Sequence, residues 1–525
     1  MMLGVTHQLC QEVAVVPLLW VLPLAIYLVS FIICFDRPQA YRRRFYIPAA
    51  GIASFVILIT SYQGVRLAVL WHILFNGLFL FLFCMTIHGE LVKLRPKPKY
   101  LTGYYLTVSA GGALGGFFIS VLAPLYLAGL WEYHIALGIG WVLIAARMIR
   151  DRSTAWFDGD AWYLHLFIAV ALYAAIRLSI FMGALRHSPT YYSNILEISL
   201  AVGMLAGVAS RLLLHKHRFS LSPIWPRLYL GLVLFAVSLF LVMKVRSDLG
   251  NRISGERNFF GTVRISAAKA KKSKPPYLCL SHGNILHGTQ ITEAGRIMEP
   301  TSYYGKNSGL AHAINYHPRQ VAGETMHIGV LGMGVGTVAA WGKTGDQIRF
   351  YEINPAVIHY AASKTKPIFQ FIQRSPAEIT VVPGDARLSM DREFNKGQVL
   401  NFDILVLDAF TSDAIPAHLI TQEALALYRK HLRGPESMIA INISNRFLDL
   451  RDLMHSLAAA EGLHCALFPS KGRTEGLETS SLWVIMSEFD AFFELPNIQD
   501  AASDYESSRE IIWTDRFSSL MPLFK

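Results

Sequence analysis

Two different patterns of hydrophobic and polar residues divide the chain. Residues 1–248 contain long apolar runs without a charged residue, such as Val13 to Cys34 and Leu228 to Met243. A run of about 20 apolar residues is long enough to cross the hydrocarbon core of a bilayer as a helix. Residues 319–525 instead alternate short apolar runs with helix-compatible segments, which is typical of an α/β domain with a parallel sheet. The pattern therefore predicts a membrane domain followed by an α/β domain.

The first 248 residues contain about eight candidate membrane spans, with a range of seven to nine. They lie at roughly 13–35, 46–63, 66–87, 102–127, 133–149, 162–183, 191–213 and 228–243. Lysine and arginine residues cluster in alternate loops between these spans, for example at 42–44 and 93–99. Because basic loops stay in the cytoplasm, these alternate loops are predicted to be cytoplasmic and the N-terminus external.

Composition supports a membrane protein and narrows its partners. Of the 525 residues, 53% are hydrophobic and only 16% are charged, which lies outside the usual range of soluble proteins. The formal net charge is +11, but many of the cations lie in short loops between apolar runs. They are therefore interpreted as topology determinants, and no nucleic acid is expected as a partner. Five cysteines without paired spacing give no zinc site and no disulfide framework.

Residues 249–318 are predicted to form a linker and a small antiparallel β subdomain. Strand-like runs lie at 258–265, 277–280 and 285–291. Two His-Gly pairs, His282-Gly283 and His287-Gly288, punctuate these runs. No carboxylate or thiol completes a metal-binding set, so both pairs are interpreted as hairpin turns.

A glycine-rich segment opens the α/β domain at 319–525. The apolar run 327–331 ends in Gly332, Gly334 and Gly336, and a second apolar run ends in Glu352, twenty residues after the first glycine. This is the layout of a nucleotide-binding βαβ unit. The glycines allow a tight turn and a close approach of the backbone to a ligand, and the next helix presents free N–H groups. Glu352 is placed to accept hydrogen bonds from both ribose hydroxyls of an adenosine.

Two further predicted strands also end in carboxylates. Asp385 follows the run 379–382, and Asp408 follows the run 402–407. In a parallel sheet, ligands bind beyond the carboxyl ends of the strands, so Glu352, Asp385 and Asp408 are expected to meet in one crevice. Asp385 is placed to accept from the exocyclic amine of adenine.

These motifs carry a family resemblance. Residues from about 256 to 490 resemble spermidine synthases, the aminopropyltransferases, whose methyltransferase-like Rossmann domain follows a small β-sheet domain. The matching segments are the glycine loop 332–336, the ribose-binding acid Glu352, the adenine-side pair Gly384-Asp385, the Asp-Gly-x-x-Gln-like segment His287-Gly288 with Gln290, the Tyr-His-Glu-like segment Tyr303-Tyr304, and Asp408, which opens the catalytic Asp-x-x-Asp loop. The whole chain is similar to the membrane-fused bacterial branch of that family, through segments 17–24, 88–91 and 111–116.

Three positions depart from the family pattern. The Asp-Gly aspartate is His287, the Tyr-His-Glu segment ends in Gly305, and the second loop aspartate is displaced to Asp413. In spermidine synthases such acids hold a polycationic amine and take its proton. The departures therefore put the amine acceptor in question more than the nucleoside.

The resemblance implies an enzyme that uses decarboxylated S-adenosylmethionine and an amine or polyamine acceptor, in polyamine biosynthesis and without a metal. Asp408 is then the base, Asp413 an amine-binding partner, and Tyr303 and Tyr304 contact the donor, with Gln290 near its tail. One alternative is methyl transfer from S-adenosylmethionine, whose carboxylate would need a partner such as His287 or His327. A second alternative is a sensor or transporter that binds a nucleoside or polyamine without turnover.

The resemblance implies a multi-pass protein of the bacterial inner membrane, with the lipid bilayer as a partner. Formation of a homodimer is left open. Eight spans would leave residues 250–525 outside the cytoplasm, whereas seven would leave them inside. Because an adenosyl donor is a cytoplasmic metabolite, we expect a cytoplasmic C-terminal domain, with the external side as the alternative.

Overall fold

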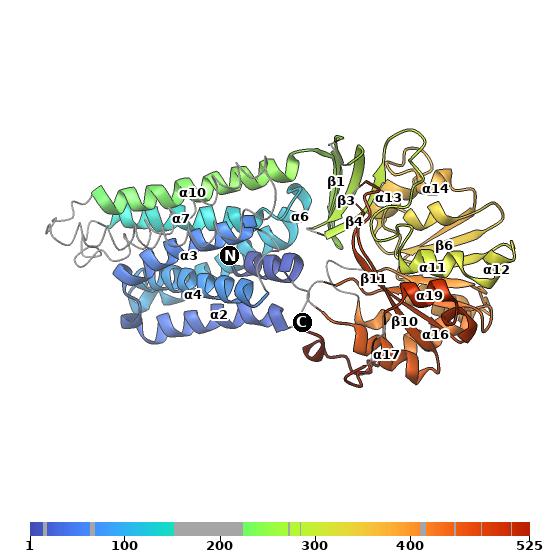
Figure 1. Ribbon diagram of the computed structural model, residues 1–525. Coiled ribbons are helices and arrows are strands. Elements are labelled where there is room, and N and C mark those ends of the chain that lie inside the picture. Colours follow the sequence, from blue (N-terminus) through green and yellow to red (C-terminus); the bar gives the residue numbers. More distant parts are fainter. Residues whose placement is uncertain are drawn as a thin grey trace, which may run out of the picture. The chain divides into compact units, whose positions relative to one another are not determined.

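The computed structural model divides the chain into two compact units, Met1–Gly250 and Asn251–Lys525 (Figure 1). The structure describes residues 1–13, 18–63, 69–151, 224–270, 274–283, 285–409, 416–445, 448–473, 475–503, 505 and 507–524. The predicted spans at 162–183 and 191–213 and the predicted site residue Asp413 lie outside the described residues.

The described part of the first unit is helical. Its elements are α1 (Met2–His7), η1 (Gln8–Val13), α2 (Leu18–Asp36), η2 (Pro38–Ala40), α3 (Arg43–Gln63), α4 (Val69–Lys93), η4 (Pro98–Tyr100), α5 (Leu101–Phe117), η5 (Phe118–Leu122), α6 (Ala123–Tyr126), α7 (Glu132–Arg150) and α10 (Ile224–Leu249). Six helical stretches among the described residues are long and apolar enough to cross a membrane: 19–36, 43–60, 70–93, 98–126, 132–150 and 229–249. They coincide with six of the predicted spans.

Aromatic side chains fill the interior of this helical unit. Phe79 and Phe83 of α4 and Trp141 of α7 are at most 2% exposed. The indole N–H of Trp141 donates to the Ser54 hydroxyl at 3.0 Å, so the polar atom of this buried ring is satisfied. This packing fixes α3, α4 and α7 side by side (Figure 1).

The second unit begins with a four-stranded antiparallel sheet in the order β1-β2-β3-β4. Its strands are β1 (Arg252–Asn258), β2 (Gly261–Ala268), β3 (Tyr277–His282) and β4 (Ile285–Ile291). The predicted strand 258–265 is wrong at its start, because a hairpin turn interrupts it. The Asn258 side chain accepts from the Phe260 N–H at 3.0 Å, and Gly261 follows with φ +122°. Such a local side-chain bond favours a turn over a continuous strand.

The prediction of two hairpin turns at the His-Gly pairs is half right. Gly283 lies in the turn after β3 with φ +59°. Gly288 instead lies inside β4 with φ +147°, where the register against β3 shifts between Leu280 and Ser281. A Cβ at Gly288 would approach Val335 to 2.5 Å, so the glycine permits a close contact with the glycine loop.

The seven-stranded sheet that follows confirms the Rossmann-like α/β fold class. Its strands are β5 (His327–Leu331), β6 (Gln347–Glu352), β7 (Glu378–Pro383), β8 (Ile404–Leu407), β9 (Met438–Asn442), β10 (His464–Ser470) and β11 (Ser481–Ser487). They lie in the order β10-β11-β9-β8-β5-β6-β7. Neighbours from β9 to β7 pair in parallel, and β11 is antiparallel to both β9 and β10. The chain reverses its winding between β5 and β8, which is where such sheets bind ligands.

Short helices and two buried clusters cover the two faces of this sheet. The helices are α11 (Gly309–Asn315), α12 (Pro318–Val321), η7 (Thr337–Trp341), α13 (Pro355–Ala362), α14 (Phe371–Arg374), α15 (Ala386–Asn395), η8 (Ala417–Leu419), α16 (Gln422–Lys430), α17 (Arg451–Ala460), α18 (Asp490–Phe493), α19 (Pro496–Ala501) and η9 (Met521–Leu523). Side chains alternate between the faces: Val330 belongs to one cluster and Leu331 to the other. Burial on both faces explains why the strands are apolar runs without alternation.

The segment after the glycine loop is not the full helix that the pattern predicts. It is the 3₁₀ helix η7, five residues long, which begins after Gly336 and ends before Gly342. Only ten residues connect Gly336 to β6, and a Cβ at Gly342 would lie 2.7 Å from Ala377. The crossover is therefore too short and too closely packed for an α-helix, and the segment 337–346 contains only η7.

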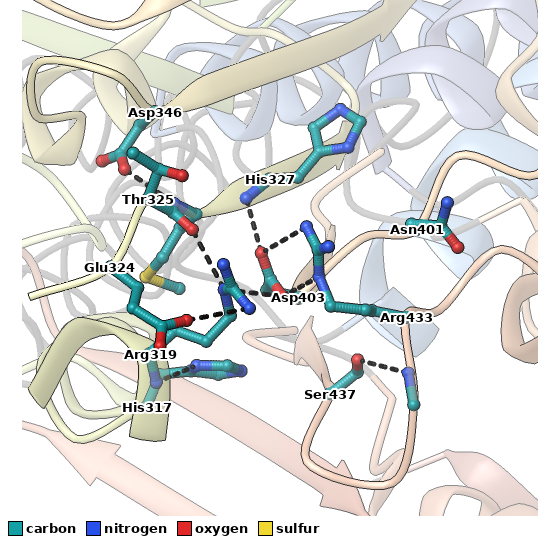
Figure 2. A network of polar contacts seen from close by, with 12 residues as sticks. His317, Arg319, Glu324, Thr325, His327, Asp346, Asn401, Asp403, Arg433 and Ser437 are labelled. Carbon is teal, nitrogen blue, oxygen red and sulfur yellow. Dashed lines mark hydrogen bonds and ion pairs between the residues drawn. The ribbon is translucent and has the colours of Figure 1, made fainter. Parts of the chain in front are cut away.

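A polar network lies at the amino-terminal ends of β5 and β8, on the side of the sheet away from the glycine loop (Figure 2). Asp403 is 1% exposed and accepts from the His327 N–H at 2.7 Å and from Arg433 Nε at 2.6 Å. Arg319 Nε lies 3.6 Å from the same carboxylate. His327 therefore belongs to this network and lies at the amino-terminal end of β5, whereas the glycines follow its carboxyl-terminal end.

Candidate functional site

A cavity of about 270 Å³ lies at the carboxyl ends of the parallel strands of the second unit. Its wall includes residues of the glycine loop, the acids that follow β6, β7 and β8, aromatic rings and histidines from the small sheet, and the loop before α16. The lining residues that matter for the chemistry are Phe260, His282, His287, Tyr303, Gly332, Met333, Gly334, Glu352, Asp385, Asp408 and His418. The structure thus brings the three predicted carboxylates to one cavity.

The glycine loop adopts a left-handed backbone conformation that residues other than glycine disfavour. Gly332, Gly334 and Gly336 have φ values of +89°, +54° and +82°. A Cβ at Gly332 would lie 2.4 Å from the Asp408 carbonyl oxygen, and one at Gly334 would lie 2.8 Å from that of His287. The loop therefore packs between the end of β8 and the small sheet. Gly336 is the N-cap residue before η7 and does not line the cavity.

Glu352 ends β6 and is 8% exposed. One carboxylate oxygen accepts from the Met333 N–H at 3.0 Å, and the other accepts from the Asn354 N–H at 2.8 Å. Burial raises the pKa of Glu352, while these backbone donors favour its charged form. The Ile353 and Gly334 N–H groups also interact with this carboxylate, which lines the cavity.

Asp385 follows β7 and already has two partners. One oxygen caps α15 by accepting from the Leu388 N–H at 2.8 Å, and the other lies 2.9 Å from His418 Nε2. The hydrogen bond with His418 holds the pKa of Asp385 below its ordinary value. A ligand amine would therefore meet a carboxylate that shares its outer oxygen with a histidine.

Asp408 follows β8 and is 9% exposed. One oxygen accepts from the Tyr304 hydroxyl, and the other accepts from Asn442 Nδ2 at 2.8 Å. Burial raises the pKa of Asp408 to about 7, and hydrogen bonds from Tyr304, Asn442 and Tyr303 oppose that shift. A carboxyl group with a pKa near neutrality can hold or release a proton at working pH, which is what a general base requires.

The two adjacent tyrosines take different positions. Tyr303 lines the cavity, and its carbonyl oxygen accepts from the Trp483 indole at 3.0 Å. Tyr304 is 2% exposed and lies behind Asp408, to which its hydroxyl donates. Burial raises the pKa of both phenols above the ordinary value, so both remain hydroxyl donors. Tyr303 thus lies on the cavity wall and Tyr304 behind it, and both phenols interact with Asp408. Their contact with a donor stays a prediction.

The two histidines of the small sheet lie beside the glycine loop. The rings of His282 and His287 are 5.4 Å apart, centroid to centroid, and both line the cavity. Among the described residues, the buried Nε2 of His287 has no hydrogen-bond partner. Burial lowers the pKa of His287 to about 3, so the ring is neutral near pH 7. It offers a polar atom to a ligand without adding charge.

Gln290 is not brought to the cavity wall. It is 2% exposed, its oxygen accepts from the Gln370 N–H at 2.9 Å, and its nitrogen donates to the Ile297 carbonyl at 3.4 Å. These contacts tie β4 to the loops around it, and its assignment to a donor tail stays a prediction. Within the described ranges, no group of three or more His, Cys, Asp or Glu side chains is placed to hold a metal ion.

Three residues of the site were not found from the sequence. Asn442 ends β9 as the acids end β6 and β8, so extending the strand-end rule by one strand would have found it. His418 lies in η8, after the loop that follows Asp408, and nothing local in the sequence pairs it with Asp385. Phe260 lines the cavity from the turn between β1 and β2. It was missed because a continuous strand, without a turn, was predicted over 258–265.

Comparison with known proteins gives partial likenesses only. No protein-family model and no curated protein matches the chain. Among solved structures, a probable spermidine synthase from Corynebacterium glutamicum ATCC 13032 is 16% identical with a TM-score of 0.33, over 45% of this chain and 80% of that chain. A spermidine synthase from Thermotoga maritima is 12% identical with a TM-score of 0.32, over 51% and 82%. A spermidine synthase in complex with the transition-state analogue AdoDATO is 11% identical with a TM-score of 0.32, over 51% and 82%. At these identities and scores, none of the likenesses defines a family for the chain.

Proposed function

We propose that the second unit binds an adenosyl-sulfonium donor and transfers an alkyl group from it to an amine. In the specific form favoured here, the donor is decarboxylated S-adenosylmethionine and the protein is a membrane-anchored aminopropyltransferase of polyamine biosynthesis. The observation that carries the proposal is the cavity at the strand ends, where a glycine loop, Glu352 and Asp385 surround a buried Asp408 whose pKa is about 7.

The nucleoside would lie across the ends of β5, β6 and β7. Glu352 presents a carboxylate on the cavity wall, which suits hydrogen bonding to the two hydroxyls of a ribose. Asp385 lies one strand further along, where it would accept from the adenine amine in place of, or together with, His418. Gly332 and Gly334 line the cavity, where the donor would contact their backbone.

The reaction needs positioning and one proton acceptor. The amine nitrogen attacks the carbon bonded to the sulfonium, the new N–C bond forms as the C–S bond breaks, and the electron pair of that bond leaves on sulfur in methylthioadenosine. The amine then loses one proton, for which Asp408 is the acceptor. Tyr304 and Asn442 fix the two oxygens of this carboxylate, and Tyr303 lies on the ligand side.

Charge also favours this class of substrate. A sulfonium donor and an ammonium acceptor are both cations. Among the described residues, the ionisable side chains of the cavity wall are three carboxylates, three histidines and two tyrosines. An amine with a pKa near that of lysine is mostly protonated at neutral pH. A carboxylate that binds the cation and then takes its proton serves both steps.

One observation supports a second candidate, methyl transfer from S-adenosylmethionine itself. That donor carries a carboxylate. His287 lines the cavity, and its Nε2, which has no partner among the described residues, is a hydrogen-bonding group for such a tail. His327, the other histidine considered for this role, belongs to the Asp403 network and does not line the cavity.

Incubation of the purified full-length protein with each labelled donor and a panel of amines separates the candidates. Mass spectrometry of the products distinguishes an added aminopropyl group from an added methyl group. The matched variants are Asp408→Asn and Asp391→Asn, because Asp391 lies exposed on α15 outside the cavity. We expect transfer that Asp408→Asn abolishes and Asp391→Asn retains. Donor binding without transfer to any amine would reject both enzymatic candidates and favour a sensor or transporter.

A further inference from the structure

One end of the helical unit is strongly basic. Three segments contribute to it: 36–44 between α2 and α3, 90–101 between α4 and α5, and 147–151 at the end of α7. These segments contain ten lysines and arginines but only three carboxylates. The cations are Arg37, Arg42, Arg43, Arg44, Lys93, Arg95, Lys97, Lys99, Arg147 and Arg150, and the carboxylates are Asp36, Glu90 and Asp151. We call these three segments together the basic end.

Ion pairs show that the three segments meet at the same end of the unit. Arg43, the first residue of α3, lies 2.6 Å from Glu90 in the last turn of α4 and 2.6 Å from Asp151 after α7. The Tyr41 hydroxyl donates to Glu90 at 2.8 Å. Lys93 lies 3.7 Å from the same carboxylate. Thus the start of α3 and the ends of α4 and α7 are joined by direct contacts.

The last helix of the unit runs away from the basic end. Near its start, the Tyr229 hydroxyl donates to the carbonyl of Pro48, in the second turn of α3, at 2.8 Å. Near its end, Asp248 accepts from the Trp131 indole at 2.8 Å, and Trp131 precedes the first residue of α7. Since α7 ends at the basic end, its start marks the opposite end. The direction of α10 is therefore fixed by contacts at both of its ends and does not depend on how the chain runs through 152–223.

Among the described residues, the opposite end lacks this cationic excess. Lys244 and Arg246 in the last turns of α10 are balanced there by Glu132 and Asp248. Lys244 Nζ lies 3.4 Å from Asp248, and His7 Nδ1 lies 3.3 Å from Glu132. At the basic end, by contrast, Arg42, Arg44, Arg95, Lys97 and Lys99 are exposed, so they are available to anionic lipid headgroups.

We propose that the six long helices cross a membrane with the basic end on the cytoplasmic side, and that residues 251–525 lie on the opposite, extracytoplasmic side. Lysine and arginine in short loops orient membrane proteins with those loops in the cytoplasm. The chain leaves α10 at Leu249, at the end away from the basic end, and the described residues after it contain no further candidate span. The proposed side is opposite to the cytoplasmic side expected because adenosyl donors are made in the cytoplasm. An adenosyl donor would then have to cross the membrane to reach the site.

A pair of reporters at the C-terminus of the full chain tests the side directly. Green fluorescent protein is fluorescent only when it folds in the cytoplasm, and alkaline phosphatase is active only outside it. We expect the alkaline phosphatase fusion to be active and the green fluorescent protein fusion to show no fluorescence. A fluorescent fusion with inactive phosphatase would overturn the proposal. Protease cleavage of a C-terminal epitope tag in intact spheroplasts gives the same answer without a reporter that must fold: cleavage supports the proposal and protection overturns it.

Charge variants test the cause of the orientation. Replacing Arg42, Arg44, Lys97 and Lys99 by glutamine removes four exposed cations from the basic end without touching the Arg43 ion pairs. We expect a several-fold fall in the fraction of protein with an external C-terminus. The control, Lys244→Gln with Arg246→Gln at the other end, should leave that fraction unchanged, and an equal effect of the two variants would overturn the charge argument. Because donor binding and transfer are measured on purified protein, failure of this topology and failure of the proposed reaction are distinguished.

Discussion

Tyr304→Phe tests whether a hydrogen bond behind Asp408 tunes the proposed base. The Tyr304 hydroxyl donates to one oxygen of Asp408 and lies outside the cavity lining, so the variant removes a proton donor without changing the ligand wall. Phenylalanine fills the same space apart from the oxygen atom, and the packing of the ring against Trp483 should remain.

The sign and size of the effect follow from the two forms of the carboxyl group. The hydrogen bond stabilises the charged form and so lowers the pKa of Asp408, which burial raises to about 7. Loss of a hydrogen bond to a charged group costs about 1.5–3 kcal/mol, and about 1.36 kcal/mol corresponds to one pKa unit. The variant should therefore raise the pKa of Asp408 by about one to two units. For a pKa that rises from about 7 to about 8–9, the ionised fraction of the base at pH 7 would fall roughly 5-fold to 50-fold.

The assay is the pH dependence of kcat/KM for amine alkylation between about pH 5.5 and 9.5. The wild-type rate should rise with pH through the pKa of Asp408, because only the ionised carboxylate accepts a proton. In Tyr304→Phe the rise should move to higher pH, with activity near that of the wild type recovered at the alkaline limit. Infrared titration of the carboxyl band that Asp408→Asn removes gives the same pKa independently of the reaction.

Tyr428→Phe is the matched control for this variant. Tyr428 is fully buried, and its hydroxyl donates to the Leu419 carbonyl at 3.0 Å, away from Asp408. It should lose stability like any buried tyrosine that loses a hydrogen bond but keep the wild-type pH profile. An unchanged profile in Tyr304→Phe, or a shift to lower pH, would refute the assignment of Asp408 as a base whose pKa is lowered by Tyr304.

Three further predictions concern the loop, the nucleoside and the edge of the sheet. Gly332→Ala should destabilise the full-length protein in thermal unfolding by at least about 2 kcal/mol more than Gly323→Ala. Both glycines have positive φ, but only at Gly332 would a Cβ lie 2.4 Å from a backbone oxygen. Equal losses of stability would contradict this close approach. Glu352→Gln should weaken donor binding about tenfold or more in calorimetry, since an amide offers one acceptor oxygen where the carboxylate offers two; an affinity within about twofold of the wild type would argue against the ribose role. Asp403→Ala should cost about 1–3 kcal/mol because the buried His327 N–H loses its acceptor, whereas Glu324→Ala, with a side chain that is 54% exposed, should change stability by less than about 0.5 kcal/mol.

The strand ends could be predicted because their pattern is local. A buried strand is an apolar run, and the first carboxylate after it lies at the carboxyl edge of the sheet, so Glu352, Asp385 and Asp408 could be placed near one another from the sequence. The winding of the sheet then fixes their order along the edge. The helix bounds of the first unit followed in the same way from long apolar runs.

Other features depended on contacts between distant segments. The position of Tyr303 on the cavity wall is one example. The preceding residue, Ser302, has a φ of +57°, and its N–H donates to the Leu477 carbonyl at 3.0 Å. A contact with so distant a segment cannot be read from the local sequence pattern. Similarly, glycine serves both turns and bulges, so the position of Gly288 inside β4 could not be separated from a hairpin turn without the neighbouring strand.

The direction of α10 is a third example of a feature that the sequence left open. Counting spans gave opposite sides for seven and eight helices, since each additional span reverses the chain. Two hydrogen bonds, from Tyr229 to Pro48 and from Trp131 to Asp248, determine the direction without any count. Side-chain contacts of this kind follow from packing and not from hydropathy.

The central claim, alkyl transfer from an adenosyl-sulfonium donor to an amine, is tested most directly by measuring both products of one incubation. Purified full-length protein is mixed with decarboxylated S-adenosylmethionine and an amine, and methylthioadenosine and alkylated amine are quantified together. We predict equal amounts of the two products, both lost in Asp408→Asn. Donor that binds and is recovered intact, with neither product formed for any amine, would contradict the claim.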